Sequence, residues 1–240
     1  TGDEDINKIL RAAHETFIQN SFDLFTDCPT RERAGWLCDS FFLGRAEKLY
    51  TGKNLIEKNF LENYLLLDNY ENIPDGMIPM CYPADVDSGG FIPNWAMWFI
   101  LELKDYSYRT GDSAFISLFR YKVYRLIGWF ERFENADGLL ERLPGWVFIE
   151  WSKANDFVQD INFPSNMLYS AALSAAGELF ADENLKQKAE KLREIIRERS
   201  FDGEFFRDNE VYNKDGVPSA TENRTETCQY HAFFFCRVQI

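Results

Sequence analysis

The sequence has few residues that could hold a metal ion. It contains two histidines, His14 and His231, which lie far apart, and five cysteines without a CxxC pair. Zinc sites and disulfide frameworks are built from closely spaced groups of these residues, so neither is indicated. Each histidine fits a partly buried helix position better than a ligand position. We therefore expect no metal ion and no other cofactor.

Positive charge and long apolar runs are also scarce. Lys and Arg number 26 against 39 Asp and Glu, which gives a formal net charge of −13. This excess repels nucleic-acid phosphates and anionic membranes, so neither is an expected partner. No apolar run approaches the length of a membrane-spanning helix. Without an initial Met or a signal sequence, the chain is expected to be excised from something longer. Its oligomeric state and compartment are left open, with a periplasmic or extracellular location favoured over the cytoplasm.

Aromatic side chains, by contrast, are abundant. They make up 16% of the 240 residues, and hydrophobic residues in total make up 45%. A chain of this length can bury a substantial core as one large domain or two small ones. Part of the aromatic content must be core, but a surplus of Trp and Tyr is also suited to stacking against sugar rings.

Apolar residues recur at helical spacing along most of the chain. The expected helices cover residues 4–20, 35–50, 53–70, 95–111, 112–134, 165–181, 183–200 and 221–238. In the first, the apolar stripe consists of Ile6, Ile9, Leu10, Ala13 and Phe17. Residues 71–93 contain four prolines and the acids Asp75, Asp85 and Asp87, and predict a long functional loop.

About eight helices with almost no strand signal predict an all-α fold. Short and long connections alternate, as in an (α/α)6 toroid that has tight turns on one rim and elaborate loops on the other. Acids and tryptophans on the elaborate rim would then converge on one pocket. A plain orthogonal bundle is the alternative, and no solenoid repeat is visible.

One stretch concentrates chemistry more than any other. Residues 27–39 read Asp-Cys-Pro-Thr-Arg-Glu-Arg-Ala-Gly-Trp-Leu-Cys-Asp, with three carboxylates, two guanidinium groups and an indole. Pro29 favours an extended turn at the start, and a helix is expected from Gly35 onward. Acids beside arginines at such a junction can have widely separated pKa values. The structural alternative is a capping and ion-pair network that fixes a turn.

This stretch resembles the signature of the family 78 glycoside hydrolases, the α-L-rhamnosidases, whose (α/α)6 barrels carry a similar Asp-Cys-Pro-x-Arg-Glu-x-x-Gly-Trp-x-x-Asp run. The resemblance implies that Glu32 is the general acid. It also implies that Asp27 and Asp39 bind the sugar and that Trp36 forms a ring wall, with Arg31 in the same substrate-binding set. We further expect the two arginines to hold the aspartates ionised, which leaves Glu32 to carry the proton.

Two further segments could contribute to the same pocket. Trp95 and Trp98 follow the Pro-rich loop, but one helical turn apart they need not face the same way. Either could be core or a stacking platform, and Trp95 is taken as a substrate-binding candidate. Relatives in the family often carry an acid near Asn94, so the Asn here departs from the pattern.

The segment 146–151 resembles the family's aromatic-acid-Trp segment. Glu150 stands where an Asp is more usual, and Trp151 is either a sugar wall or core. Both are taken as substrate-binding residues. The segment's short apolar run predicts a strand or a pocket-lining turn.

The resemblance departs at the general base, which in this family is a Glu in later helices after a Gly- and Thr-rich Trp-Glu motif. No such motif occurs here. Four carboxylates remain in the chain without a base-like motif: Glu150, Asp160, Glu222 and Glu226. We expect residues 1–240 to form about eight of the twelve barrel helices of one catalytic domain, with the rest of the barrel and flanking β domains outside this chain.

The expected function is release of terminal α-L-rhamnose with inversion, and the expected partner is a rhamnose-containing glycoside or polysaccharide. By itself this chain should be inactive, because no residue activates the water. Two alternatives belong to other classes. One is a non-catalytic carbohydrate-binding helical domain, and the other is a different (α/α)6 carbohydrate-active enzyme, such as a phosphorylase or uronyl hydrolase.

Overall fold

The computed structural model describes residues 2–84 and 90–236, so the predicted loop acids Asp85 and Asp87 lie outside the described residues. Helices dominate the described part. Their bounds are α1 Glu4–Gln19, α2 Asp39–Thr51, α3 Leu55–Asn63, α4 Pro93–Thr110, α5 Ser113–Ser117, α6 Arg120–Glu131, α7 Phe163–Leu179, α8 Glu183–Ser200 and α9 Glu226–Phe235, with a 3-10 turn at Lys153–Phe157. None of the helices in the described ranges is long and apolar enough to cross a membrane.

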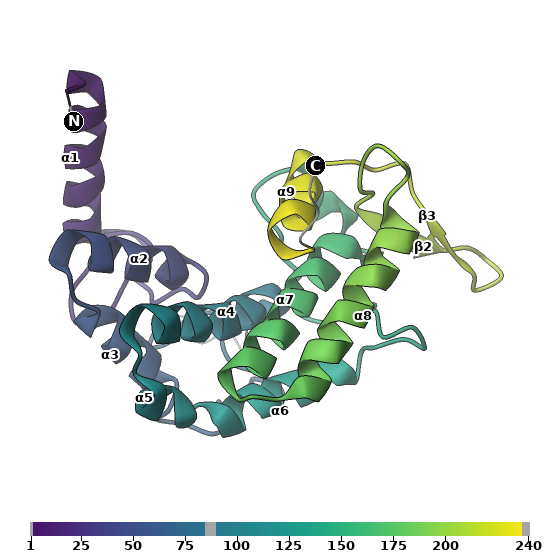
Figure 1. Ribbon diagram of the computed structural model, residues 1–240, viewed down its shortest axis with the longest axis horizontal. Helices are drawn as coiled ribbons and strands as arrows, with labels where there is room; N and C mark the ends of the chain where they lie inside the picture. Colours follow the sequence, from purple (N-terminus) through teal and green to yellow (C-terminus); the bar gives the residue numbers. More distant parts are fainter. Residues whose placement is uncertain (1, 85–89, 237–240) are drawn as a thin grey trace.

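The helices form two layers. In one layer α2 packs on α4, α4 on α7, and α7 on α9, so these four make a continuous row. The second layer backs this row, because α1 and α3 pack on α2, α5 on α4, and α8 on α7. Figure 1 shows the row as an open arc with the purple α1 near one end and the yellow α9 at the other. A two-layered arc is the arrangement that the toroid prediction requires, and the all-α prediction is confirmed.

Helix α7 lies inside the arc, and it carries a group of small side chains beside larger ones such as Phe163 and Tyr169. It packs against α4, α8 and α9, and nearly its whole length is buried. The small residues on it are Ala171, Ala172, Ala175 and Ala176, all buried. Small side chains let neighbouring helix backbones approach closely, so one helix can contact three others.

A small antiparallel sheet was not predicted. Its order is β1 (Ile161–Asn162), β2 (Asn209–Tyr212) and β3 (Pro218–Ala220). The register pairs Ile161 with Glu210, and Glu210 with Ala220. These strands are too short for an alternating pattern to stand out in the sequence. The segment 146–151, which could have been a strand, is an irregular loop.

Four helix predictions need correction. The expected helix 221–238 begins at Glu226, and three others differ as follows. The expected helix 112–134 is two helices, with Leu118 and Phe119 between α5 and α6. The expected helix 53–70 ends at Asn63, and the one expected from Gly35 begins at Asp39. In the last case the residues before Asp39 pair with a distant segment, as described below, and that pairing overrides the local helical pattern.

Helix α1 forms as predicted, but its apolar stripe is not buried by the described residues. Phe17 is buried, whereas Ile6, Ile9 and Leu10 are 45%, 68% and 45% exposed. At the other end of the arc, Phe233 and Phe234 of α9 are 51% and 69% exposed. Large apolar side chains therefore face outward at both ends of the helix row.

Candidate active site

The predicted signature is a loop that closes on itself before α2. The backbone N–H of Asp27 donates to the Ala34 carbonyl at 3.1 Å. The N–H of Ala34 donates back to the Asp27 carboxylate, also at 3.1 Å. Asp27 therefore has a structural role in closing the loop as well as its predicted role in sugar binding.

A second segment anchors this loop from the Pro-rich region. Leu37 N–H donates to the Met80 carbonyl at 2.9 Å, and Tyr82 N–H donates to the Gly35 carbonyl at 3.2 Å. A Cβ atom at Gly35 would lie 3.1 Å from both the Phe60 ring and the Tyr82 carbonyl oxygen. The predicted long loop thus supports the signature, and Gly35 is required because the two backbones approach so closely.

Glu32 lies within this loop with its side chain 31% exposed. Its Oε2 accepts the indole N–H of Trp36 at 2.9 Å. Its Oε1 forms an ion pair with Arg31, whose side chain is 81% exposed. The Glu32 backbone N–H donates to the Cys28 sulfur at 3.2 Å. The carboxylate is therefore held by one partly buried donor and one that extends into solvent.

The expected pairing of the arginines with the aspartates is wrong. Arg31 pairs with Glu32, and the Arg33 guanidinium lies 5.8 Å from the centre of the Phe22 ring. The perturbed acid is instead Asp39. Burial, and then the negative charges of Asp27 and Glu32, raise the pKa of the Asp39 carboxyl to about 6. The surroundings of Asp39 thus favour its protonated form in mildly acidic solution.

The three predicted tryptophans belong to one chain of aromatic rings. The rings of Trp36 and Trp95 contact edge to face, with their centres 5.2 Å apart, and the centres of the Trp95 and Phe148 rings are 5.7 Å apart. Phe148 in turn contacts Trp151 at 4.9 Å and Trp146 at 5.3 Å. Trp151 is 80% exposed, so the chain runs from Glu32 to a ring that is open to solvent. These edge-to-face contacts add to the stability gained from burial.

Sequence reasoning did not select Phe148, which is buried and connects Trp95 to Trp151. Its signal is local: it lies between two tryptophans inside a short apolar run. Trp95 and Trp98, whose relative facing the spacing left open, contact different groups of rings. Trp98 contacts Phe41 at 4.9 Å and Phe235 at 5.6 Å, away from the aromatic chain.

These contacts bring the starts of all four helices in the row to one rim. Trp36 precedes α2, Trp95 lies in the first turn of α4, and Phe148 is in the loop that leads to α7. Ser152 of that loop and Thr227 in the first turn of α9 have their hydroxyl oxygens 3.4 Å apart. The elaborate rim that the sequence predicted is therefore present.

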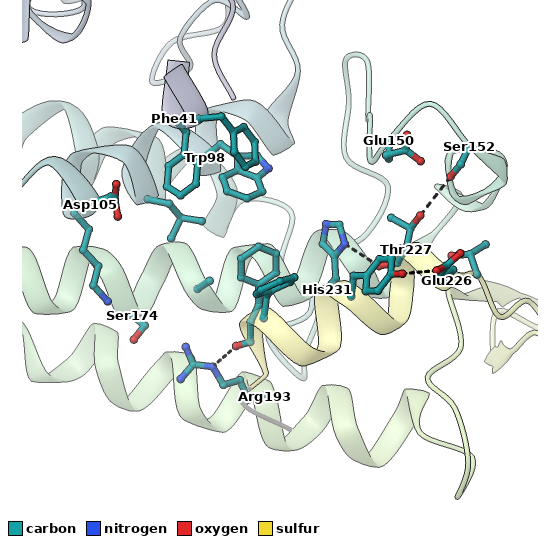
Figure 2. Close-up of a pocket in the computed structure, with 18 of the residues that line it drawn as sticks. Phe41, Trp98, Asp105, Glu150, Ser152, Ser174, Arg193, Glu226, Thr227 and His231 are labelled. Atoms are coloured by element: carbon teal, nitrogen blue, oxygen red, sulfur yellow. Dashed lines mark hydrogen bonds between the residues drawn. The ribbon is translucent and has the colours of Figure 1, made fainter. Parts of the chain in front are cut away.

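A cavity of about 1130 Å³ lies beside this rim, along the row of α2, α4, α7 and α9. Figure 2 shows Phe41 and Trp98 on one side of it, and Glu150, Ser152, Glu226, Thr227 and His231 at its polar end. Among the described residues that line it, Glu150 is the one residue of the predicted site. The cavity is therefore adjacent to the signature loop and distinct from it.

Three of the four base candidates, and the histidine His231, have other partners. Glu222 pairs with Arg224 at 3.1 Å. Asp160 pairs with Arg142 at 2.9 Å, and Glu226 accepts the hydroxyl of Tyr230. His231 is largely buried, which lowers its pKa, and its Nδ1 lies 3.0 Å from the Thr227 carbonyl oxygen. Within residues 2–84 and 90–236, no group of His, Cys, Asp or Glu could hold a metal ion.

Asn94, where relatives often carry an acid, is a structural residue here. It is 2% exposed and its amide N–H donates to Ser165 Oγ at 2.9 Å. Ser165 Oγ donates onward to Asn162, whose side chain caps α7. Asn94 therefore links α4 to α7 and offers no charge to the rim.

Paired helices in a two-layered arc, with acids and tryptophans gathered at one rim, define the class of helical-hairpin toroids. Within that class, residues 1–230 match the family model described as the bacterial alpha-L-rhamnosidase six-hairpin glycosidase domain. The chain belongs to this family.

Solved structures of similar fold include a family 78 rhamnosidase of Bacillus sp. GL1, with a TM-score of 0.75 and 22% identity over 95% of this chain. A rhamnosidase from Klebsiella oxytoca with rhamnose bound has a TM-score of 0.74 and 16% identity over 96%. A family 105 glycoside hydrolase of C. acetobutylicum has a TM-score of 0.59 and 15% identity, with 98% of this chain and 74% of that chain covered. At these identities the likeness shows a shared fold.

This chain spans 24% of the Bacillus rhamnosidase and 44% of the Klebsiella one. A search of curated protein sequences gave no significant match.

Proposed function

We propose that this chain is part of the catalytic domain of an inverting glycoside hydrolase that releases terminal α-L-rhamnose, with Glu32 as the general acid. Family membership supports the reaction class. The observation that carries the residue assignment is the placement of Glu32 at the inner end of an aromatic chain that reaches solvent at Trp151. A sugar ring stacked along such a chain would lie close to a carboxyl group, which is what glycoside hydrolysis needs.

For Glu32 to donate a proton to a bridging oxygen, its ion pair with Arg31 must open. The Trp36 indole N–H fixes one carboxylate oxygen, and Arg31, which is largely exposed, can move away from the other when a sugar enters. Asp27, Asp39 and Glu150 would accept hydrogen bonds from sugar hydroxyls, and Arg31 would donate one. Trp36, Trp95 and Trp151 would contact the apolar faces of the sugar.

Inversion requires a second carboxylate about 6.5–9.5 Å from the acid, on the opposite face of the sugar, to activate water. Of the four in-chain candidates, Asp160, Glu222 and Glu226 have partners in Arg142, Arg224 and Tyr230, and Glu150 is assigned to sugar binding. We therefore propose that the base comes from outside these residues. The 240-residue chain should show no turnover of an aryl α-L-rhamnoside, and measurable turnover would contradict this.

The same proposal accounts for the exposed apolar faces at the two ends of the helix row. On α1 these are Ile6, Ile9 and Leu10, and on α9 they are Phe233 and Phe234. Contiguous apolar surface of this kind marks an interaction site. Further helical hairpins of one catalytic domain, together with flanking β domains, would cover both ends and close the ring around the cavity.

The decisive test of Glu32 is the variant E32Q in the full-length gene product. Gln keeps the shape of Glu and still accepts the Trp36 N–H, but it cannot donate the proton. We expect kcat on an aryl α-L-rhamnoside to fall about a hundredfold or more, with rhamnose affinity retained. The variant E204Q, at an exposed turn before β2, is the matched control and should keep full activity.

Unchanged activity in E32Q would contradict the assignment of Glu32. A non-catalytic carbohydrate-binding domain predicts instead that the parent protein has no activity to lose. The third reading is a different toroid enzyme, and a family 105 glycoside hydrolase shares this fold over 98% of this chain. A binding screen with rhamnose, glucose and an unsaturated uronate distinguishes this reading from the rhamnosidase proposal, because a different toroid enzyme is expected to show no preference for rhamnose.

A further inference from the structure

A second group of acids lies between α2, α3 and α4. Glu47 accepts the first three backbone N–H groups of α3, at 2.7, 3.0 and 2.9 Å, and so caps that helix. Glu57 forms an ion pair with Arg109 and also accepts from Asn54 at 2.9 Å. These buried carboxylates are satisfied either by backbone donors or by a cation, as buried charges require.

Glu102 of α4 is the exception. It is 0% exposed, and none of the ion pairs of the described residues includes it. Its Oε2 lies 2.6 Å from Ser40 Oγ, and its Oε1 has no hydrogen-bond partner within the described part of the chain. Burial, and then the negative charge of Glu57, raise the pKa of Glu102 well above its usual range. Burial without a cation therefore favours the uncharged form of the Glu102 carboxyl.

Ser40, the partner of Glu102, lies in the first turn of α2. Ser40 directly follows Asp39, which is the first residue of α2. Cys38 precedes them in a left-handed conformation, with φ of 74°, and its side chain makes no capping hydrogen bond. The start of α2 therefore lacks the usual side-chain cap, and its first turn is joined to α4 by the contact of Ser40 with Glu102.

We propose that Glu102, acting through Ser40, is a positioning residue that holds the carboxyl group of Asp39 in its buried place at the rim. The contact joins the first turn of α2 to the middle of α4, whose own first turn carries Trp95. The contact thereby fixes the position of Asp39, at the start of α2, relative to Trp95, at the start of α4. This inference rests on the proposed role of Asp39 in sugar binding.

The charges around Glu102 explain why a neutral group is used. The ionisable groups that face it are Glu57 and Tyr64 at α3, Asp105 and Arg109 on α4, and Cys38 before α2. Arg109 is already shared between Glu57 and Asp105. A third carboxylate would be buried without a cation, so the proton remains and Glu102 acts through hydrogen bonding and shape.

Three substitutions separate the contribution of the Ser40 hydroxyl from the contributions of the Glu102 carboxyl. S40A removes the hydroxyl that links the helices, E102Q keeps the shape and hydrogen bonding without an ionisable group, and E102L removes the polar contact. S200A is the matched control, because Ser200 is also a buried helical serine, but its hydroxyl donates to the Ile196 carbonyl within its own helix, α8. The readouts are the titration of Asp39, by carbon NMR of labelled aspartate carboxyls assigned with D39N, and L-rhamnose binding by calorimetry.

We expect Asp39 to titrate near pH 6 in the unmodified protein, in E102Q and in S200A. In S40A and E102L the carboxyl becomes more hydrated, so its midpoint should fall by about one pH unit or more. Rhamnose affinity should weaken about tenfold in these two variants, because a small displacement of a contact group is costly, and E102Q should restore it.

An unchanged Asp39 midpoint in S40A would overturn the proposal, as would an E102Q variant that behaves like E102L. If E102L does not fold, S40A and E102Q decide the matter. If the unmodified protein does not bind rhamnose, the proposed function fails, while the Asp39 titration still tests whether Glu102 positions that carboxyl.

Discussion

The raised pKa of Asp39 predicts that the candidate site lowers the stability of the fold. Asp39 titrates near pH 6 in the folded protein, against an ordinary value of 3.8. Each tenfold change in proton affinity corresponds to about 1.4 kcal/mol, so ionising Asp39 costs the folded state about 3 kcal/mol. This cost reflects burial first and repulsion from Asp27 and Glu32 second.

The sign of the pH dependence follows from proton binding. Between pH 3.8 and about 6 the folded state holds the Asp39 proton and the unfolded state does not. Stability therefore falls as pH rises through this window, and the full loss is present at pH 7. The variant D39N has no carboxylate to ionise and avoids this loss. We expect D39N to be more stable than the unmodified chain by about 3 kcal/mol at pH 7, and by far less at pH 4.

Urea unfolding at pH 4, 5, 6, 7 and 8, followed by circular dichroism, measures this difference. The control D215N, in the exposed turn between β2 and β3, should follow the unmodified chain at every pH. A stability gain in D39N that stays constant from pH 4 to pH 8 would refute the reasoning, because it would show that the gain does not come from ionisation of Asp39.

Two further predictions follow from other contacts. In G44A the new Cβ would overlap the Glu57 carboxylate. The buried pair of Glu57 and Arg109 would separate, so urea unfolding should show a loss of about 3 kcal/mol or more, whereas G128A, where a Cβ meets nothing within 4 Å, should lose little. In W151A the lost ring is 80% exposed, so the melting temperature should hardly change. Rhamnose affinity measured by calorimetry should nevertheless fall about tenfold, and an unchanged affinity would remove Trp151 from the proposed site.

The sequence predicted the helices well where local signals decide the structure. Helix α8 covers the predicted 183–200, because Asp182 caps its start and Leu185, Ala189, Leu192 and Ile196 keep one buried face. The start of α2 was misplaced because Leu37 bonds to Met80, which is far away in the sequence. The small sheet was missed for a similar reason, since two-residue β1 exists only through its pairing with β2.

The same distinction applies to the candidate site. Contacts between residues close in sequence could be predicted, whereas contacts between distant segments could not. Glu32 and Trp36, which are in contact, lie only four residues apart, and the signature contains both of them. The role of Phe148, and the buried proton on Glu102, depend on which distant groups surround them, so no local pattern reveals them. The arginine prediction failed because Arg31 adjoins Glu32, and an adjacent partner competes successfully with both aspartates.

The gathering of four helix starts at one rim has an electrostatic consequence. Each helix start carries partial positive charge from its unpaired backbone N–H groups, equivalent to about half an elementary charge. The starts of α2, α4, α7 and α9 thus surround the acids of this rim with macrodipoles of favourable sign. In a chain with a net charge of −13, these dipoles offset part of the repulsion among the carboxylates of the rim.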